Sequence, residues 1–384
     1  MSLKFQISQL SWILIFSCAS MFALGLGDNI RGPLFADLIT HFDLTNTQAS
    51  FSFAITSTFG FIGNLISSIV LRRISLSQLL SHALLLMALG LFLMGLTNTF
   101  NLYLLSAALF GLGMGLLGVA QNLLVAENFH GVRQAQALSG LHGLYGLSSL
   151  IAPFVAAYGP HFFGYARSAF YITAAISVIV YLTAVSFKPK GPIVHVVRDG
   201  IKAASDVSRY ALFIFGGILA FYVVAEILIS TRIALYMREI FHFNLEASSL
   251  YVTYFFVFLL IGRVLFALKK FQFKLKSQLN FLMIFSFLFL LAGLVVHPFF
   301  LALTGLAMAP YYPLAMAYLS ELTQEHKRKI ITFAMGLQNF ALIIMHVGVG
   351  FLTDKFGLLN AFGVGLIAIL LTLICVNFHP RVLT

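Results

Sequence analysis

Two acidic side chains lie deep inside long apolar stretches of the sequence, where an ionised group is costly. Asp28 lies 19 residues after Gln9, and Glu226 lies 17 residues after Arg209, so the two are at similar depths in their stretches. A charged side chain at the centre of a bilayer costs about 2.5–3.5 kcal/mol on insertion scales, and such residues usually belong to ion or substrate pathways. We therefore expect Asp28 and Glu226 to couple the movement of a solute to a proton or a sodium ion.

A purely structural role is the alternative for both carboxylates. Arg31 follows Asp28 by one helical turn, so the two charges can lie on one face of a helix and neutralise each other. Arg232 follows Glu226 by six residues and therefore falls on a different face of the helix, so it is a poorer partner for that carboxylate.

Further polar side chains fall inside the same apolar stretches, and most of them carry amide, phenol or imidazole groups. Groups that offer donors and acceptors without net charge suit an uncharged, polyhydroxylated solute. The candidate substrate-binding residues are Asn29, Arg31, Gln121, Asn122, His142, Tyr145, Tyr222, Tyr311, Tyr312, Gln338 and Asn339. Hydrogen bonding between helices, worth about 0.6 kcal/mol per contact in a membrane, is the alternative interpretation.

The sequence has none of the patterns expected of an enzyme. We find no catalytic triad and no His-Glu-x-x-His pattern, and Cys18 and Cys375 lie far apart in apolar stretches, which gives no metal-ligand spacing. We therefore expect a protein that is not an enzyme and that needs no cofactor and no metal.

Glycines recur at short spacing in two of the apolar stretches. They are Gly111, Gly113, Gly115 and Gly118 in one and Gly140, Gly143 and Gly146 in the next. No Lys-Ser or Lys-Thr follows the first group, so it is not a phosphate-binding loop. Small residues at this spacing let membrane helices approach closely, and we expect packing to be their role.

The elements that must hold these residues are long apolar helices. Hydrophobic residues make up 60% of the 384 residues and charged residues only 9%, whereas a soluble protein carries about 25% charged residues. Each apolar stretch is long enough to cross about 30 Å of hydrocarbon as a helix. The predicted spans are roughly 9–37, 46–70, 76–97, 101–126, 134–158, 167–187, 210–237, 247–268, 277–296, 299–320, 329–352 and 359–378.

The order of these spans predicts an all-α membrane protein with 12 transmembrane helices in two six-helix bundles. Helices are required because a backbone group left unpaired in lipid costs several kcal/mol. The predicted parts are an N-terminal bundle at 1–187, a basic cytoplasmic linker at 188–209 and a C-terminal bundle at 210–384.

Basic residues are distributed unevenly between the spans. With the N-terminus inside, the inner segments carry most of the Lys and Arg, whereas the outer segments carry only Arg167, Arg238 and Lys355. The positive-inside rule then predicts a multi-pass protein of the cell membrane with both termini cytoplasmic. The net charge of +11 is spread over short clusters and forms no patch for nucleic acid. We expect a monomer that contacts the lipid bilayer, a small-molecule substrate and the coupling ion.

Short motifs in several spans resemble the major facilitator superfamily, and more narrowly its fucose:proton symporter family of sugar carriers. The motifs are Gly27-Asp28-Asn29 ahead of Pro33, Phe42-Asp43-Leu44 with Gln48-Ala49, Gly111 to Gly115 through Asn122, Leu141-His142-Gly143 with Tyr145 and Pro153, Tyr222 through Glu226, and Pro310-Tyr311-Tyr312-Pro313. The resemblance implies that Asp28 or Asn29 occupies the proton-linked position and that the bundle centre binds a sugar. The family often carries a Glu where this chain has Gly118, so a second coupling carboxylate is missing there.

The same resemblance suggests residues that gate the carrier. The family's inner loop after the second span usually reads Asp-Arg-x-Gly, whereas this chain reads Arg72-Arg73-Ile-Ser, and clearer copies begin at Gly262-Arg263 and surround Asp354-Lys355. The resemblance implies that Arg72, Arg73, Gly262, Arg263, Asp354 and Lys355 hold one conformer closed.

These observations predict a secondary active transporter that moves a small polar solute, with a sugar as the first expectation, by alternating access coupled to a proton or sodium gradient. Two alternatives stay open. One is proton-driven efflux of amphipathic compounds, which the 41 Phe residues would suit. The other is a membrane sensor or scaffold without transport.

Overall fold

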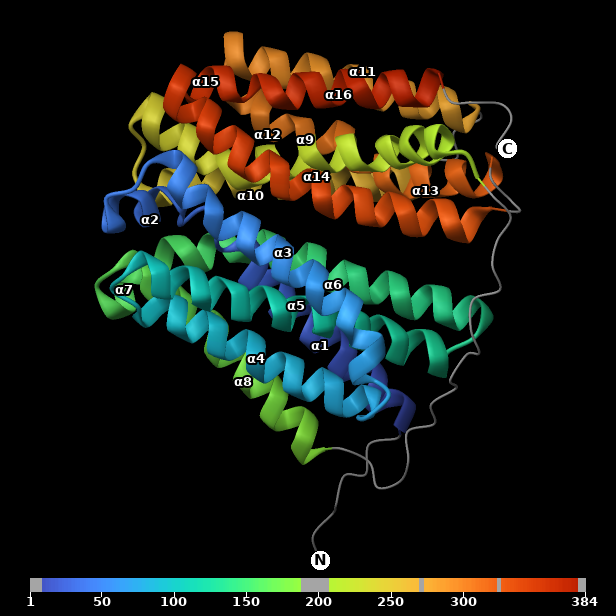
Figure 1. The fold of residues 1–384 in the computed structure, drawn as a ribbon. Coiled ribbons are helices and arrows are strands. Elements are labelled where there is room, and N and C mark those ends of the chain that lie inside the picture. Colours follow the sequence, from blue (N-terminus) through green and yellow to red (C-terminus); the bar gives the residue numbers. More distant parts are fainter. Residues whose placement is uncertain (1–8, 188–206, 269–272, 323–325, 379–384) are drawn as a thin grey trace, which may run out of the picture. The chain divides into compact units, whose positions relative to one another are not determined.

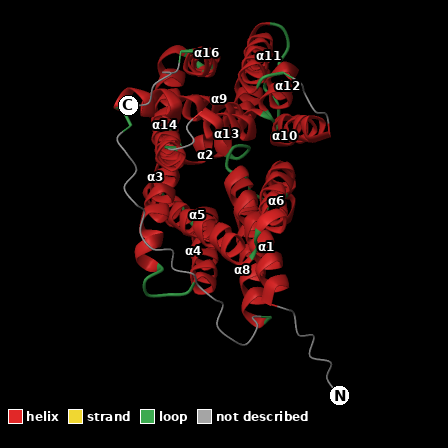
Figure 2. Ribbon diagram, turned by 90° about the vertical axis from the view of Figure 1, so that its right-hand side faces the viewer, coloured by secondary structure: helices red, strands yellow, loops and turns green. Residues whose placement is uncertain are grey.

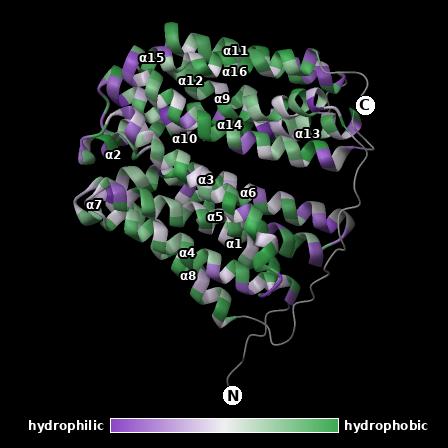
Figure 3. Cartoon of the chain, in the orientation of Figure 1, coloured by the Kyte–Doolittle hydropathy of each residue, from purple (hydrophilic) through white to green (hydrophobic). Residues whose placement is uncertain are grey.

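The computed structural model describes residues 9–187, 207–268, 273–322 and 326–378, and in these ranges all regular structure is helical (Figure 2). Twelve of the helices formed by the described residues are long and apolar enough to cross a membrane. Apolar residues cover the length of these helices (Figure 3), and many large ones, such as Leu65, Ile69 and Leu105, are exposed on their surfaces. The prediction of an all-α, twelve-helix membrane protein is confirmed.

The chain divides into two compact units. The first comprises Met1–Asp37 and Ile55–Asp199, and the second comprises Leu38–Ala54 and Gly200–Thr384. Residues 38–54, which the sequence placed in the N-terminal bundle, therefore pack with the second unit. The predicted linker at 188–209 lies almost entirely outside the described residues.

In the first unit, the fifth span (α6) packs on the first (α1), and the third span (α4) packs on the fourth (α5) and the sixth (α8) (Figure 1). The helices wholly within this unit are α1 (Gln9–Asn29), α4 (Leu76–Leu96), α5 (Phe100–Asn128), α6 (Gly131–Tyr158), α7 (Pro160–Phe163), the short 3-10 helix η1 (Ala166–Ser168) and α8 (Ala169–Ser186). Two more helices, α2 (Phe35–Phe42) and α3 (Asn46–Val70), cross the boundary between the units.

The second unit repeats part of this packing, since its first and fifth spans, α9 and α14, also lie against each other. Its helices are α9 (Arg209–Phe241), α10 (Leu245–Leu268), α11 (Leu275–Val295), α12 (Phe299–Met308), α13 (Tyr311–Leu322), α14 (Lys327–Phe356), α15 (Leu358–Ala361) and α16 (Gly363–Asn377). The pairing of equivalent spans is the arrangement expected of two structural repeats.

Proline breaks two of the predicted spans. The first was predicted to run to residue 37, but α1 ends at Asn29 and a turn leads to α2. Pro33 explains the difference, because proline lacks an N–H and disfavours helical geometry in the residue before it. Pro310 likewise separates α12 from α13.

Gly111, Gly113 and Gly115 of α5 have the packing role that the sequence predicted. A Cβ atom on Gly115 would lie 2.1 Å from the carbonyl oxygen of Gly60 on α3, and one on Gly111 would lie 2.3 Å from that of Thr56. The second half of α3 is thus in backbone contact with α5. The packing prediction is wrong for Gly118 of α5 and for Gly140 and Gly143 of α6, where a Cβ atom would meet nothing within 4 Å.

Candidate functional site

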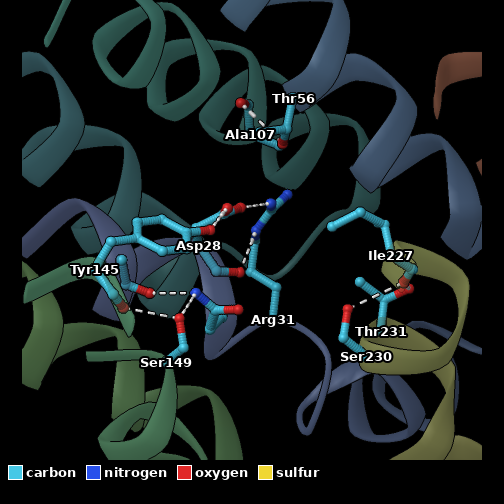
Figure 4. A network of polar contacts seen from close by, with 11 residues as sticks. Asp28, Arg31, Thr56, Ala107, Tyr145, Ser149, Ile227, Ser230 and Thr231 are labelled. Carbon is cyan, nitrogen blue, oxygen red and sulfur yellow. Dashed lines mark hydrogen bonds and ion pairs between the residues drawn. The ribbon is translucent and has the colours of Figure 1, made fainter. Parts of the chain in front are cut away.

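Asp28 is the centre of a polar cluster in the first unit (Figure 4). Its Oδ1 forms an ion pair with Nη2 of Arg31, and its Oδ2 accepts a 2.7 Å hydrogen bond from the Tyr145 hydroxyl of α6. Nε of Arg31 also donates to the Asp28 carbonyl at 3.2 Å. The Asp28 side chain is 27% exposed and that of Arg31 is 10% exposed. Each carboxylate oxygen of Asp28 therefore has one donor, and the group is only partly covered by protein.

The position of Asp28 on its helix makes these partners necessary. Asp28 is the last residue but one of α1, where the unpaired carbonyl groups of a helix end carry partial negative charge. A carboxylate at this end is disfavoured, whereas the guanidinium of Arg31 just beyond it is favoured. Arg31 is fixed further by the ring of Phe110 on α5, which lies 5.2 Å from its central carbon.

A second set of hydrogen bonds fastens α1 to α6 beside this cluster. Asn29 donates through Nδ2 to the Gly25 carbonyl and to Oγ of Ser149, both at 2.9 Å. Ser149 in turn donates to the Tyr145 carbonyl at 2.9 Å. Sequence reasoning missed Ser149; its place one turn after Tyr145 on the same face of a helix was the available signal.

Glu226 lies in a cluster of aromatic side chains in the second unit. Its electrostatic neighbours are Tyr222 on α9, Arg263 on α10 and Tyr312 on α13. The Tyr222 ring stacks on that of Tyr311, with ring centres 4.4 Å apart. The clustering around Glu226 therefore joins residues from three spans.

The hydroxyl groups of two of these tyrosines are bonded to the backbone. That of Tyr222 donates to the Met308 carbonyl at 2.9 Å, next to the break at Pro310, and that of Tyr311 donates to the Ile218 carbonyl at 3.2 Å. Both residues are fully buried, whereas Tyr312 is partly exposed. Tyr312 is therefore the tyrosine of this cluster that has surface left for a solute.

The amide side chains that the sequence singled out have different surroundings. Gln121 is fully buried, accepts from Oγ of Ser20 at 2.9 Å and donates to the Met21 sulfur at 3.1 Å, which joins α5 to α1. Asn122 and Asn339 each donate to a carbonyl of their own helix.

Two more of the predicted substrate-binding residues, Gln338 and His142, differ in how exposed their side chains are. The Gln338 Oε1 atom is buried without a hydrogen-bond partner in the described part of the chain. His142 lies on the exposed side of α6.

Most of the predicted gating residues are exposed, and Asp354 has the most extensive polar contacts of the set. Arg72 and Arg73 lie in the exposed turn after α3, Arg263 is exposed on α10, and Lys355 lies over the Phe351 and Phe356 rings. Gly262 packs on α12, where a Cβ atom would lie 2.5 Å from the Leu306 carbonyl oxygen.

Asp354, near the end of α14, caps the N-terminus of α3. Its carboxylate accepts from the backbone N–H groups of Asn46 and Thr47, both at 2.8 Å, and from the Thr47 hydroxyl at 2.6 Å. The first N–H groups of a helix have no partner within the helix, and a carboxylate is a strong acceptor for them.

Further contacts attach the first half of α3 to α14 and α9 within the second unit. Gly350 of α14 lies so close to α3 that a Cβ atom would be 2.4 Å from Oγ of Ser50. Arg232 of α9, buried to 1% exposure, donates to the same Oγ at 2.8 Å. The Phe53 ring lies 5.2 Å from the Arg232 guanidinium carbon and stacks on His346 at 4.8 Å. We call this set, with Asp354, Asn46 and Thr47, the α3 contact.

Comparison with known proteins gives a family and a fold. Residues 17–345 match the family described as the Major Facilitator Superfamily. The human sodium-dependent glucose transporter 1 is 30% identical over 146 residues, which cover 37% of this chain and only 28% of that protein.

Solved transporter structures resemble the chain over nearly its whole length. A D-xylose-proton symporter gives a TM-score of 0.75 at 15% identity, covering 97% of this chain and 99% of that one. A peptide transporter, POT, also gives 0.75 at 16% identity over 96% and 94% of the two chains. The transporter FucP gives 0.60 at 17% identity over 96% and 98%. At these identities the similarity shows the fold.

Proposed function

Because the chain belongs to the Major Facilitator Superfamily and is therefore a membrane transport protein, we propose that it is an ion-coupled carrier of a neutral, polyhydroxylated solute of the size of a sugar. The superfamily is the one that the motifs around Asp28, Tyr145 and Pro310 resemble. The observation that carries the proposal is the partly exposed Asp28 carboxylate, held inside an apolar bundle by Arg31 and Tyr145.

The proposed coupling follows from the cost of charge in a membrane. An ionised Asp28 is compensated by Arg31 and Tyr145 in this structure. Binding of one cation, either a proton or a sodium ion, changes the charge of that cluster and so changes the free energy of any conformational step that moves it. Entry of one positive charge releases about 2.3 kcal/mol per 100 mV of membrane potential. Glu226, which lies at a similar distance from the start of its own helix, is proposed as a second coupling group.

The proposed solute class rests on the kind of polar groups around the two carboxylates. Asn29 and Tyr145 beside Asp28, and Tyr312 and Gln338 in the second unit, present amides and phenols. A buried acceptor without a partner, such as Gln338 Oε1, costs about 1–3 kcal/mol, and a hydroxyl group of a solute would relieve that cost. The similarity to a sodium-dependent glucose transporter and to a D-xylose-proton symporter supports this class.

The α3 contact is proposed as one of the gates. The first half of α3 is held by Asp354 and Arg232, and the second half is packed on α5 through glycines. Water can replace the exposed hydrogen bonds to Asp354, whereas it cannot replace the close backbone packing at the glycines. We therefore propose that the first half of α3 separates from α14 and α9 when the gate opens. We also propose that the remaining gating candidates hold one conformer closed. The sequence further predicts that both termini are cytoplasmic and that the protein is a monomer in the cell membrane.

Uptake into proteoliposomes tests this function. The purified chain is reconstituted and offered a panel of radiolabelled sugars, with a proton gradient, a sodium gradient or no gradient imposed. We expect accumulation of at least one sugar above its outside concentration under one of the two gradients. Absence of any sugar uptake, together with gradient-driven extrusion of an amphipathic dye, would reject the sugar class in favour of efflux.

A further inference from the structure

The Tyr145 hydroxyl is placed so that its single hydrogen can serve only one acceptor at a time. In this structure it donates to Oδ2 of Asp28 at 2.7 Å. The residue is partly exposed, and its hydroxyl is bonded to a carboxylate whose side chain is itself 27% exposed. A phenol hydroxyl can also accept a hydrogen bond through its oxygen.

The ring that carries this hydroxyl is held in place. The Tyr145 carbonyl accepts hydrogen bonds from Oγ of Ser148 at 2.7 Å and of Ser149 at 2.9 Å. The ring itself packs on the α1 backbone, since a Cβ atom on Gly25 would lie 3.1 Å from it. Rotation of the O–H bond is therefore the movement that remains available to the group.

Protonation of Asp28 on Oδ2 changes the direction of that O–H bond, whereas Oδ1 stays an acceptor because the Arg31 guanidinium can only donate. The ionised carboxylate only accepts hydrogen bonds, whereas the acid has one O–H of its own to donate. When Oδ2 takes a proton from water, it donates to the Tyr145 oxygen, and the Tyr145 hydrogen turns away from Asp28. The ion pair with Arg31 is lost at the same step, since the acid carries no charge.

The charged groups that act on Tyr145 lie on α1 and in the turn that follows it. Asp28 and Arg31 are the groups whose charges act on Tyr145, and Arg31 in turn acts on Tyr103 of α5. The Asn29 amide lies beside the hydroxyl, and His142 is exposed one turn before Tyr145 on α6. None of the charges acting on Tyr145 comes from α4 or α8, the other helices of the described chain that pack on α1.

We propose that the Tyr145 hydroxyl is a two-position donor that makes the binding of solute depend on the protonation of Asp28. It donates to Asp28 while the carboxylate is ionised, and it donates to a hydroxyl oxygen of the solute once Asp28 is protonated. Proton and solute then bind with positive cooperativity, and each raises the affinity of the other by the same factor. The inference rests on the proposed function and commits it to the proton as the coupling ion.

The solute-binding consequence is tested with Tyr145→Phe, which keeps the ring and removes only the hydroxyl. Exchange of D-glucose and D-xylose across proteoliposomes without any gradient gives the half-saturating concentration at acidic and at alkaline pH. We expect Tyr145→Phe to weaken the apparent affinity about two- to tenfold at acidic pH and to leave it nearly unchanged at alkaline pH. Tyr158→Phe, an exposed tyrosine later on α6, is the matched control and should have no effect. An equal loss at both pH values would show a merely structural hydroxyl and overturn the proposal.

An infrared measurement tests the hydrogen-bond exchange without a solute. The carbonyl stretch of protonated Asp28 is obtained from the acid-induced difference spectrum of the wild-type chain, identified by its absence in Asp28→Asn. We expect this band to shift in Tyr145→Phe, because the acid loses the phenol oxygen to which it donates. An unshifted band overturns the switch. Failure of the wild-type chain to exchange any sugar of the panel rejects the proposed substrate class, and the infrared result still decides the switch.

Discussion

Replacing Asp354 with alanine removes the acceptor of three hydrogen bonds at the start of α3. The N–H groups of Asn46 and Thr47 and the Thr47 hydroxyl lose their partner. The rest of the α3 contact stays, because Arg232 still donates to Ser50 and Phe53 still lies between Arg232 and His346. We therefore expect the attachment of α3 to α14 to be weakened but not lost.

The size of the effect follows from the capping geometry. Loss of a helix N-cap side chain costs about 0.5–2 kcal/mol, and a carboxylate near a helix N-terminus gains about 0.3–1 kcal/mol from the helix dipole when it is exposed. Asp354 is exposed, so the lower part of each range applies. We expect a weakening of about 1–2 kcal/mol, which raises the population with α3 detached about 5- to 30-fold.

Chemical labelling measures that population. Ala49 of α3 is fully buried and takes no part in the polar contacts, so Ala49→Cys, in a chain with Cys18 and Cys375 replaced by serine, reports detachment through its rate of reaction with a maleimide. The rate should rise in Asp354→Ala by the factor above. It should rise less in Asp354→Asn, whose amide oxygen can still accept from one N–H group.

Glu321→Ala is the matched control, because it removes an exposed carboxylate near the end of α13 in the same unit. An unchanged labelling rate in Asp354→Ala, or an equal rise in Glu321→Ala, would refute the capping argument.

Two packing predictions follow from other contacts. Gly115→Leu should lower the thermal unfolding temperature of the purified protein strongly, because its Cβ atom would lie 2.1 Å from the Gly60 oxygen and overpacking costs about 1–3 kcal/mol or more. Gly118→Ala, with nothing within 4 Å of the added atom, should leave that temperature unchanged; a matching loss in both variants would contradict the packing. Gln121→Leu should lower it modestly while sugar uptake persists, since the Gln121 amide is bonded to Ser20 and Met21. Lost uptake at unchanged stability would instead make Gln121 a solute contact.

The sequence predicted the helices well because hydropathy and length decide which segments cross a bilayer. Its largest error, the end of the first span, arose because apolar residues continue past Pro33 although the helix ends at Asn29. The packing of α5 through Gly111 and Gly115 was also predictable from their spacing. The same argument failed for Gly140 and Gly143, because spacing does not show which face of α6 meets another helix.

The candidate site was predictable only where its partners are close in sequence. The pairing of Asp28 with Arg31 follows from their spacing on one helix. The hydrogen bond from Tyr145 could not be predicted, because it depends on how α1 packs on α6. Asp354 was found through a family motif, but its partners Asn46 and Thr47 lie at the far end of the chain and only the folded second unit brings them together.

The role of Asp28 in coupling is tested most directly by Asp28→Asn in proteoliposomes. The asparagine is close to the size of the aspartate and cannot change its charge, so it should abolish accumulation of sugar against its concentration gradient while gradient-free exchange continues. Asp43→Asn, the same change at an exposed residue between α2 and α3, should accumulate sugar normally. Undiminished uphill uptake by Asp28→Asn would contradict the mechanism proposed for this carrier.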